Sequence, residues 1–235
     1  NGSDTDDDND GIPDTLENET GRDPLRADYM VSASKDFTCA LESGNVVCWG
    51  NSSAGKTDVP SLSNPTYVSP GWEHVCALDD SGVVCWGRNT YGETVVPTLS
   101  NPTAVATGKD HSCAIDDTGV VCWGRDNKKQ LQVPALSNPT QITTLNDHIC
   151  ALDDSGVVCW GSNTFNRAIS PNAISNATQI SSGYAHNCVI DDSGVFCWGY
   201  NGGQRRAPPA LSNPTVVSAG GLNSCAIDDS GVVCW

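Results

Sequence analysis

The stretch of sequence that decides the fold is His74-Val-Cys-Ala-Leu-Asp-Asp-Ser-Gly-Val-Val-Cys-Trp-Gly87. Its centre, Asp-Asp-Ser-Gly at residues 79–82, combines side-chain acceptors with a glycine that tolerates positive φ, and it separates two runs of apolar and β-branched residues. The stretch therefore predicts a β-hairpin. If the turn has a two-residue tip, Cys76 lies directly opposite Cys85 in a non-hydrogen-bonded pair, where Cα atoms approach to about 4.5 Å. That separation allows a disulfide within the hairpin.

The same hairpin recurs along the chain, which is therefore a repeat array. Eight residues separate the two cysteines of each pair, and successive pairs begin 37 or 38 residues apart. The pairs are Cys39 and Cys48, Cys76 and Cys85, Cys113 and Cys122, Cys150 and Cys159, Cys188 and Cys197, and Cys225 and Cys234. A tryptophan follows every second cysteine, at Trp49, Trp86, Trp123, Trp160, Trp198 and Trp235. A period in this range is typical of propellers and solenoids.

One bridge within each hairpin would use every cysteine of the chain. The reducing pool of the cytosol keeps thiols open, so six disulfides predict an oxidising compartment, outside the cell or on its surface. Zinc is the alternative use of paired cysteines, but zinc sites normally place two ligands two to four residues apart. Each bridge closes a loop of about ten residues, which contributes roughly 2 to 3 kcal/mol in the chain-entropy model.

The composition narrows the possible partners. Lys and Arg total 12 against 28 Asp and Glu, and a net charge of −16 argues against nucleic acid, whose phosphates would be repelled. Cations are the expected small partners.

No stretch approaches the eighteen or so apolar residues of a membrane helix, and no basic and apolar leader is present. We therefore expect no membrane insertion and a mature or excised portion of a soluble protein.

The segment before the array has the spacing of a calcium loop. Counting Asp6 as the first position, oxygen ligands fall at positions 1, 3, 5, 7, 9 and 12 around a glycine at position 6. The predicted metal ligands are Asp6, Asp8, Asp10, Ile12 through its carbonyl, Asp14 and Glu17. The alternative is a solvated acidic linker, although a random acidic run would not place the glycine and the last glutamate in register.

Residues 18–28, Asn-Glu-Thr-Gly-Arg-Asp-Pro-Leu-Arg-Ala-Asp, follow this loop. Together with the loop they resemble the bacterial thrombospondin type 3 repeat, which implies a calcium-rigidified linker over residues 1–28. Such repeats are found on secreted or surface proteins, commonly between larger domains. The single copy, with Arg22 in place of the more usual Thr, does not support a rod that holds many ions.

The segments Gly-x-x-His-x-Cys-Ala-Leu and Gly-Val-Val-Cys-Trp-Gly resemble the regulator of chromosome condensation repeat family in its short bacterial form. The resemblance covers roughly residues 29–235 and implies an all-β fold, a β-propeller of 37-residue repeats. We expect six blades because six hairpins are visible, and seven are the alternative because family members usually have seven. The short-repeat members include secreted proteins, among them a propeller-type inhibitor of β-lactamase. The eukaryotic namesake binds histones and DNA, which the bridges and acidic charge here oppose.

Three repeated positions are candidate functional residues. His74, His111, His148 and His186 occupy one slot and could form a metal-binding ring, but side chains that bond neighbouring backbone and lock adjacent blades explain them better. The acids at the hairpin tips could bind calcium, but turn formation explains them. The tryptophans after the cysteines are expected to pack toward the next blade, with each indole N–H on a carbonyl. Trp72 is the one extra indole and a candidate for partner contact.

No catalytic constellation is visible, so we expect that the chain is not an enzyme. The leading interpretation is an extracellular structural module, a calcium-stiffened propeller bead of a tandem-repeat surface protein or filament that contacts neighbouring copies end to end. The alternative is a secreted protein-binding propeller, of adhesin or inhibitor type, that recognises a partner through its blade-edge loops. Those loops do differ between repeats, as between residues 88–96 and residues 162–173.

Overall fold

The computed structural model describes residues 29–171, 174–200 and 210–235, and in these residues it contains six three-stranded antiparallel sheets. The predicted all-β fold with six blades is confirmed. The sheets are β1 (Tyr29–Ala33), β2 (Phe37–Glu42) and β3 (Asn45–Gly50); β4 (Tyr67–Pro70), β5 (His74–Asp79) and β6 (Gly82–Gly87); β7 (Ala104–Thr107), β8 (His111–Asp116) and β9 (Gly119–Gly124); β10 (Gln141–Thr144), β11 (His148–Asp153) and β12 (Gly156–Gly161); β13 (Gln179–Ser182), β14 (His186–Asp191) and β15 (Gly194–Gly199); and β16 (Val216–Ala219), β17 (Ser224–Asp228) and β18 (Gly231–Cys234).

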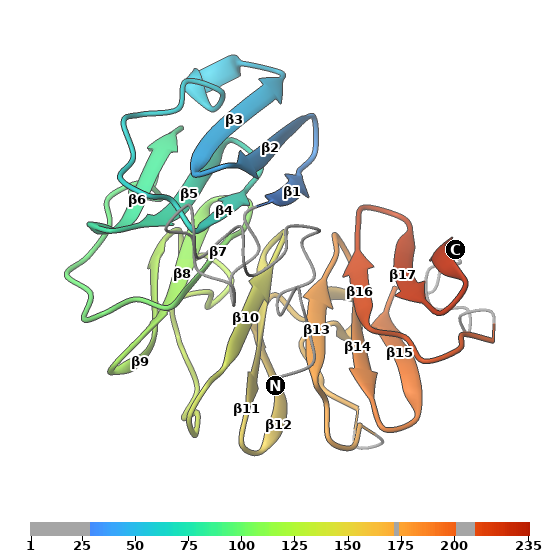
Figure 1. Cartoon of the computed structure of the whole chain (residues 1–235). Helices are drawn as coiled ribbons and strands as arrows, with labels where there is room; N and C mark the ends of the chain where they lie inside the picture. The colour runs from blue at the N-terminus through green and yellow to red at the C-terminus, as the bar shows by residue number, and fades with distance from the viewer. Residues whose placement is uncertain (1–28, 172–173, 201–209) are drawn as a thin grey trace, which may run out of the picture.

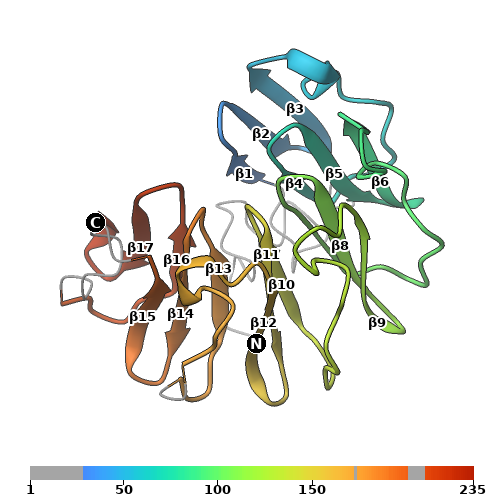
Figure 2. The same cartoon turned by 180° about the vertical axis from the view of Figure 1, so that it is seen from behind.

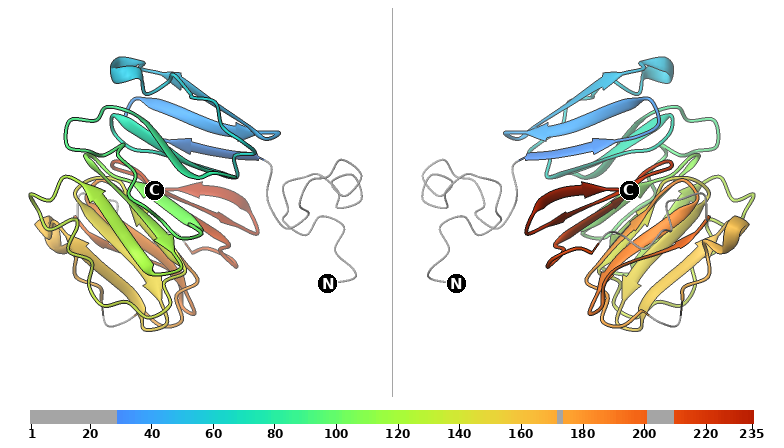
Figure 3. Two further views of the ribbon diagram at one scale, coloured as in Figure 1. Left: turned by 90° about the vertical axis from the view of Figure 1, so that its left-hand side faces the viewer. Right: turned by 90° about the vertical axis from the view of Figure 1, so that its right-hand side faces the viewer.

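The sheets stand around a central axis, with the first strand of each sheet innermost and the hairpin outside it (Figure 1). The view from behind shows the same radial arrangement (Figure 2), and the side views show neighbouring sheets lying face to face (Figure 3). Two short 3-10 turns, η1 (Ser53–Gly55) and η2 (Thr164–Asn166), lie in the connections between sheets. A helix with the length and apolar character of a membrane span is absent from the described residues.

Each hairpin has the register that the sequence predicts. Cys76 lies opposite Cys85, and Asp79 opposite Gly82, which leaves a two-residue tip. The two cysteine Cα atoms are 4.1 Å apart and their sulfurs are bonded.

The other five predicted bridges are present as well, with Cα separations of 4.0 to 4.1 Å. They join Cys39 with Cys48, Cys113 with Cys122, Cys150 with Cys159, Cys188 with Cys197, and Cys225 with Cys234. The two cysteines of a pair differ in burial: Cys39 is fully buried, whereas its partner Cys48 is only partly buried. Cys197 is an exception among the second cysteines, because it is buried in the cluster that also holds Cys188 and Val217. The described residues contain no free cysteine.

The hairpin tips are held by the turn that leads into the same sheet. Asp79 Oδ2 accepts the backbone N–H of Ser63, and Asp79 Oδ1 accepts the N–H of Ser81. Asn64, the residue before a proline in the Ser-Asn-Pro-Thr segment, has a φ of 47°, which an asparagine adopts more readily than most residues. Its side chain binds Asp80 at 2.6 Å. The interpretation of the paired acids as turn-forming residues therefore holds.

The core lies between neighbouring sheets. Leu78 of the second sheet packs on Val105, Ala114 and Trp123 of the third, and this contact is repeated around the array. Each sheet buries both of its faces against neighbouring sheets. Burial contributes roughly 25 cal/mol per Å² of apolar surface, so small apolar side chains on both faces stabilise the array. The propeller is therefore a series of similar interfaces, each made by two consecutive repeats.

This series is interrupted between the last sheet and the first. Trp49 of the first sheet is 50% exposed, whereas Trp86, Trp123, Trp160 and Trp198 are at most 8% exposed. Val31 is 69% exposed, while Val68 in the same position of the second sheet is fully buried. On the last sheet Ile227 and Val232 are 43% and 72% exposed. We call these two surfaces the open blade faces; Figure 1 shows the sheets that carry them on either side of an open sector.

The predicted calcium ligands Asp6, Asp8, Asp10, Ile12, Asp14 and Glu17 lie outside the described residues. The same is true of the whole linker predicted over residues 1–28. Both remain predictions.

Candidate binding surfaces around the central channel

The four histidines join neighbouring sheets. His74 Nε2 lies 2.9 Å from the Ser112 hydroxyl of the next sheet, and His111 Nε2 lies 3.1 Å from the hydroxyl of Thr144. His148 makes the same contact with Asn187 at 2.7 Å, and His186 with Ser224 at 2.8 Å. The expected locking role is confirmed, with a side chain of the next sheet as the partner rather than its backbone. The described residues contain no cluster of three or more His, Cys, Asp or Glu that could hold a metal.

Burial keeps these imidazoles neutral. It lowers the pKa of His74, His111 and His148 to about 3, and that of His186 to about 4. The positive charge of Arg88 lowers the pKa of His74 further, and that of Arg167 lowers the pKa of His148. A proton on any of these rings would have to be carried in an apolar interface.

The tryptophans bind carbonyls, as predicted, but on the preceding side of the sheet rather than toward the next blade. The Trp86 indole donates to the carbonyl of Lys56 at 3.1 Å, and Trp86 packs in one cluster with Phe37 and Leu41 of the first sheet. The cysteines occupy the opposite face and contact the following sheet, as Cys76 does beside Val105. The predicted contact of the indole with a carbonyl is confirmed, and the prediction that the Trp side chains pack toward the next blade is wrong.

The carbonyls that accept the indoles belong to a recurring buried polar position. Lys56, Glu93, Gln130 and Arg167 lie 37 residues apart, and each is at most 3% exposed. The ammonium of Lys56 binds Asp36 at 2.8 Å and Glu73 at 3.1 Å, and Glu93 accepts a hydrogen bond from Arg88. These side chains tie each connecting loop to the sheets beside it. The sequence analysis missed this position because a cation, an acid and an amide all occupy it, so no single residue type marks it. Only the spacing of 37 residues indicates it.

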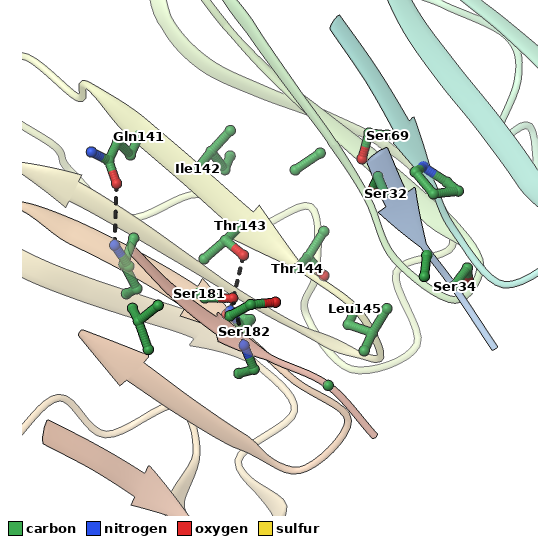
Figure 4. Close-up of a pocket in the computed structure, with 18 of the residues that line it drawn as sticks. Ser32, Ser34, Ser69, Gln141, Ile142, Thr143, Thr144, Leu145, Ser181 and Ser182 are labelled. Atoms are coloured by element: carbon green, nitrogen blue, oxygen red, sulfur yellow. Dashed lines mark hydrogen bonds between the residues drawn. The ribbon is translucent and has the colours of Figure 1, made fainter. Parts of the chain in front are cut away.

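The innermost strands surround a central channel of about 1200 Å³ (Figure 4). Hydroxyl and amide side chains line it and also join the strands. Thr143 Oγ1 accepts the backbone N–H of Ser182 at 3.0 Å, and Gln141 Oε1 accepts that of Ile180 at 3.1 Å. The hydroxyls of Ser69 and Thr107 join two further strands and lie 2.9 Å apart. Apolar side chains such as Val105, Ile142 and Leu145 line the channel as well, so its wall offers both hydrogen-bonding groups and apolar surface.

Two aromatic rings meet at one end of the channel. Trp72 precedes β5 and Tyr184 precedes β14, yet their ring centroids are 5.7 Å apart and nearly parallel, at 11°. The second and fifth sheets are not neighbours, so the pair reaches across the channel. The ammonium groups of Lys35 and Lys109 lie 5.3 Å and 4.8 Å from the centroid of Trp72. We call these four residues the channel mouth.

The sequence predicts only part of the channel mouth. Trp72 is a candidate for partner contact by its sequence alone, whereas Lys35, Lys109 and Tyr184 are not. All four occupy one slot of the repeat, two residues before the histidine position or its equivalent at Phe37. The residue in this slot varies between repeats while its neighbours are constant. That contrast is the sequence feature that could have indicated a binding position.

Comparison with known proteins identifies the repeat. Residues 66–93, 103–130 and 177–203 match the Regulator of chromosome condensation (RCC1) repeat. These three segments are repeats of the RCC1 type. The matched segments hold the hairpin and the turn after it, which are the parts that form the disulfides and the Trp contacts. No curated protein sequence matches the chain.

Solved structures show the same propeller fold. The ectodomain of the receptor kinase CR4 from Physcomitrella patens superimposes with a TM-score of 0.71 at 23% identity, over 87% of this chain and 60% of that one. The CRINKLY WD40 ectodomain of the receptor kinase ACR4 from Arabidopsis thaliana gives 0.68 at 24%, over 87% and 79%. Prp20p from Saccharomyces cerevisiae, whose structure was described with its binding to Gsp1p and histones, gives 0.69 at 17%, over 84% and 67%.

This RCC1-type propeller thus spans three-fifths of the length of the CR4 ectodomain that it resembles. Its six disulfides indicate an extracellular protein.

Proposed function

We propose that this chain is an extracellular structural module, a calcium-stiffened propeller bead of a tandem-repeat surface protein or filament. The observation that carries the proposal is the pair of open blade faces, which expose apolar side chains whose counterparts in the other sheets are buried or partly buried. Trp49 and Val31 form one face, and Ile227 and Val232 form the other. Exposed apolar surface of this kind marks a contact with another protein surface.

The two open blade faces are chemically different, which determines the kind of contact they favour. The face of the first sheet offers an indole, whose counterparts in the other sheets donate to a loop carbonyl of the preceding repeat, as Trp160 does to Gln130. The face of the last sheet offers the side chains that a following sheet would cover. The two faces complement each other rather than themselves, so copies that use them associate head to tail, and a heterologous contact that does not close on itself produces a filament.

Calcium is the second part of this proposal. Residues 1–28 carry the oxygen ligands Asp6 to Glu17 at calcium-loop spacing. An ion there would stiffen the segment between one propeller and whatever precedes it. We also expect no enzymatic activity, since the repeated positions are occupied by locking and turn-forming contacts.

Sedimentation velocity at rising protein concentration, with and without calcium, tests the proposal. We expect concentration-dependent association that Trp49→Glu or Val232→Glu abolishes, because a charge on either face opposes burial. Phe165→Glu is the matched control, since Phe165 is equally exposed, at 50%, but lies in η2 away from both faces. Discrete monomers at every concentration, or association that Phe165→Glu disrupts equally, would contradict the structural role.

The second candidate is a protein-binding propeller that uses its blade-edge loops. It is favoured by Phe165, whose ring lies 4.7 Å from that of Tyr200 on the neighbouring connection, and by Tyr91, which is 45% exposed. Aromatic residues at protruding loops are frequent anchors of protein interfaces. Cross-linking on the native cell surface separates the candidates. Cross-links from the loops to a different protein favour binding, and cross-links from the open blade faces to copies of the same chain favour the structural role.

A further inference from the structure

We propose that the channel mouth binds a short acidic oligosaccharide, one that carries carboxylates on its sugar rings. This inference goes beyond the structural role proposed above and does not depend on it. It rests on three features of the mouth: its charge, the unused hydrogen-bonding groups of the channel wall behind it, and its exposed aromatic ring.

The mouth is a cationic spot on a strongly acidic protein. The chain carries a net charge of −16, yet the ammonium groups of Lys35 and Lys109 both lie close to the Trp72 ring. Within the described residues, neither ammonium lies within ion-pairing distance of a carboxylate. Lys56 shows the contrast, because two acids surround it. Two ammonium groups beside a channel, with no carboxylate from the described part of the chain to neutralise them, favour an anionic ligand.

The channel wall offers hydrogen bonds that the fold does not use. The side-chain oxygens of Thr143 and Ser181 accept backbone N–H groups of the next sheet, which leaves their hydroxyl protons available to another acceptor. Ser182 is 5% exposed and lines the channel, and its hydroxyl has no partner among the described residues. A buried polar group without a partner costs about 1 to 3 kcal/mol, which a ligand hydroxyl could recover. Figure 4 shows these side chains together on the wall.

The aromatic pair selects between two kinds of anion. Tyr184 is 42% exposed and its ring stacks on Trp72, so the pair offers an exposed aromatic surface at the channel mouth. A sugar ring can lie on such a surface and direct its hydroxyls to the hydroxyl groups of the channel wall. An acidic peptide would instead need apolar pockets or a free sheet edge. The innermost strands are the edges of their sheets, but side chains of the preceding sheet already accept N–H groups at that edge, as Thr143 does for Ser182. Carboxylates on a hydroxyl-rich ligand fit this surface best.

Titration calorimetry with trigalacturonate and with the neutral galactotriose tests the proposal. We expect saturable binding of trigalacturonate, about tenfold or more tighter than galactotriose and weaker at about 150 mM than at about 20 mM NaCl. Lys35→Gln combined with Lys109→Gln should weaken binding about tenfold and reduce its dependence on salt. Tyr184→Ala should weaken both saccharides, and Ser182→Ala should cost a smaller factor of about threefold.

Two variants serve as controls. Lys128→Gln combined with Lys129→Gln removes the same charge from the exposed connection after β9. Tyr91→Ala removes a ring of similar exposure, and neither control should change the affinity. Circular dichroism of each variant checks that it folds. The proposal is overturned by an absence of binding at millimolar trigalacturonate, by equal binding of the neutral sugar, or by equal losses in the control variants. Tighter binding of hexaglutamate through the same lysines would also overturn it, and would assign an acidic peptide instead.

Discussion

Acidification should destabilise the propeller through its buried histidines, well above the pH at which carboxylates become protonated. In the unfolded chain a histidine titrates near pH 6.5. In the folded protein the pKa of His111 is lowered to about 3. The stability that the neutral ring provides is therefore complete above about pH 6.5 and is lost as the pH falls toward about 3, because only the unfolded state takes up the proton.

The magnitude follows from the size of this difference. Each buried histidine should lower the free energy of unfolding by about 1.4 kcal/mol for every pH unit below 6.5, or about 2 kcal/mol at pH 5. Four such residues give a slope of roughly 5 kcal/mol per pH unit. A slope of that size is comparable with the whole stability of many domains, which is about 5 to 15 kcal/mol.

Denaturant unfolding at a series of pH values between about 7.5 and 4.5 measures the slope. His111→Asn should reduce it by about one quarter, since one of four titrating rings is removed. The last repeat supplies a matched control, because its residue in this slot is Asn223, which is exposed. Asn223→His adds an imidazole with little burial and should leave the slope unchanged. A slope that His111→Asn leaves intact, or that Asn223→His increases equally, would refute the reasoning.

Three further predictions concern the repeat itself. Trp160→Phe should lower the free energy of unfolding by about 1 to 3 kcal/mol, because the Gln130 carbonyl loses its hydrogen-bond donor at 2.9 Å. Trp49→Phe should change it by less than about 0.5 kcal/mol, because Trp49 is exposed. Thermal unfolding compares the two variants, and equal losses would contradict the assignment of the open blade face. Replacing Cys113 and Cys122 by serine should cost roughly 2 to 3 kcal/mol in a denaturant titration, and an unchanged midpoint would exclude a stabilising bridge. Asp153→Ala should cost about 1 to 3 kcal/mol, since its carboxylate accepts the N–H groups of Ser137 and Ser155; hydrogen exchange should then be faster at those two amides, and unchanged exchange there would count against the turn.

Much of the fold could be predicted because strand alternation and turn length leave few choices. With the tip at residues 80–81, counting alone puts Cys76 opposite Cys85, and the structure agrees. The sequence could not indicate which neighbour each face meets. Alternation places Trp86 and Cys85 on opposite faces, but the direction in which the sheets follow one another around the axis decides that Trp86 contacts the first sheet.

The binding surfaces were harder to predict for a different reason. Trp72 and Tyr184 are 112 positions apart in the sequence numbering and meet only because the ring brings the loops of the second and fifth sheets to the same opening. The open blade faces likewise depend on burial between sheets, since Trp49 and Trp86 have the same sequence surroundings and different exposure. The sequence pattern within one repeat determines the structure of a blade. The arrangement of the six sheets around the axis determines which of the repeated residues are available for binding.

The most direct test of the account is a map of the disulfides in the native, unreduced protein by proteolysis and mass spectrometry. Six bridges are expected, each joining two cysteines nine positions apart, such as Cys76 with Cys85 and Cys150 with Cys159. Free thiols, or bridges that join cysteines of different repeats, would contradict both the stapled propeller and its extracellular location.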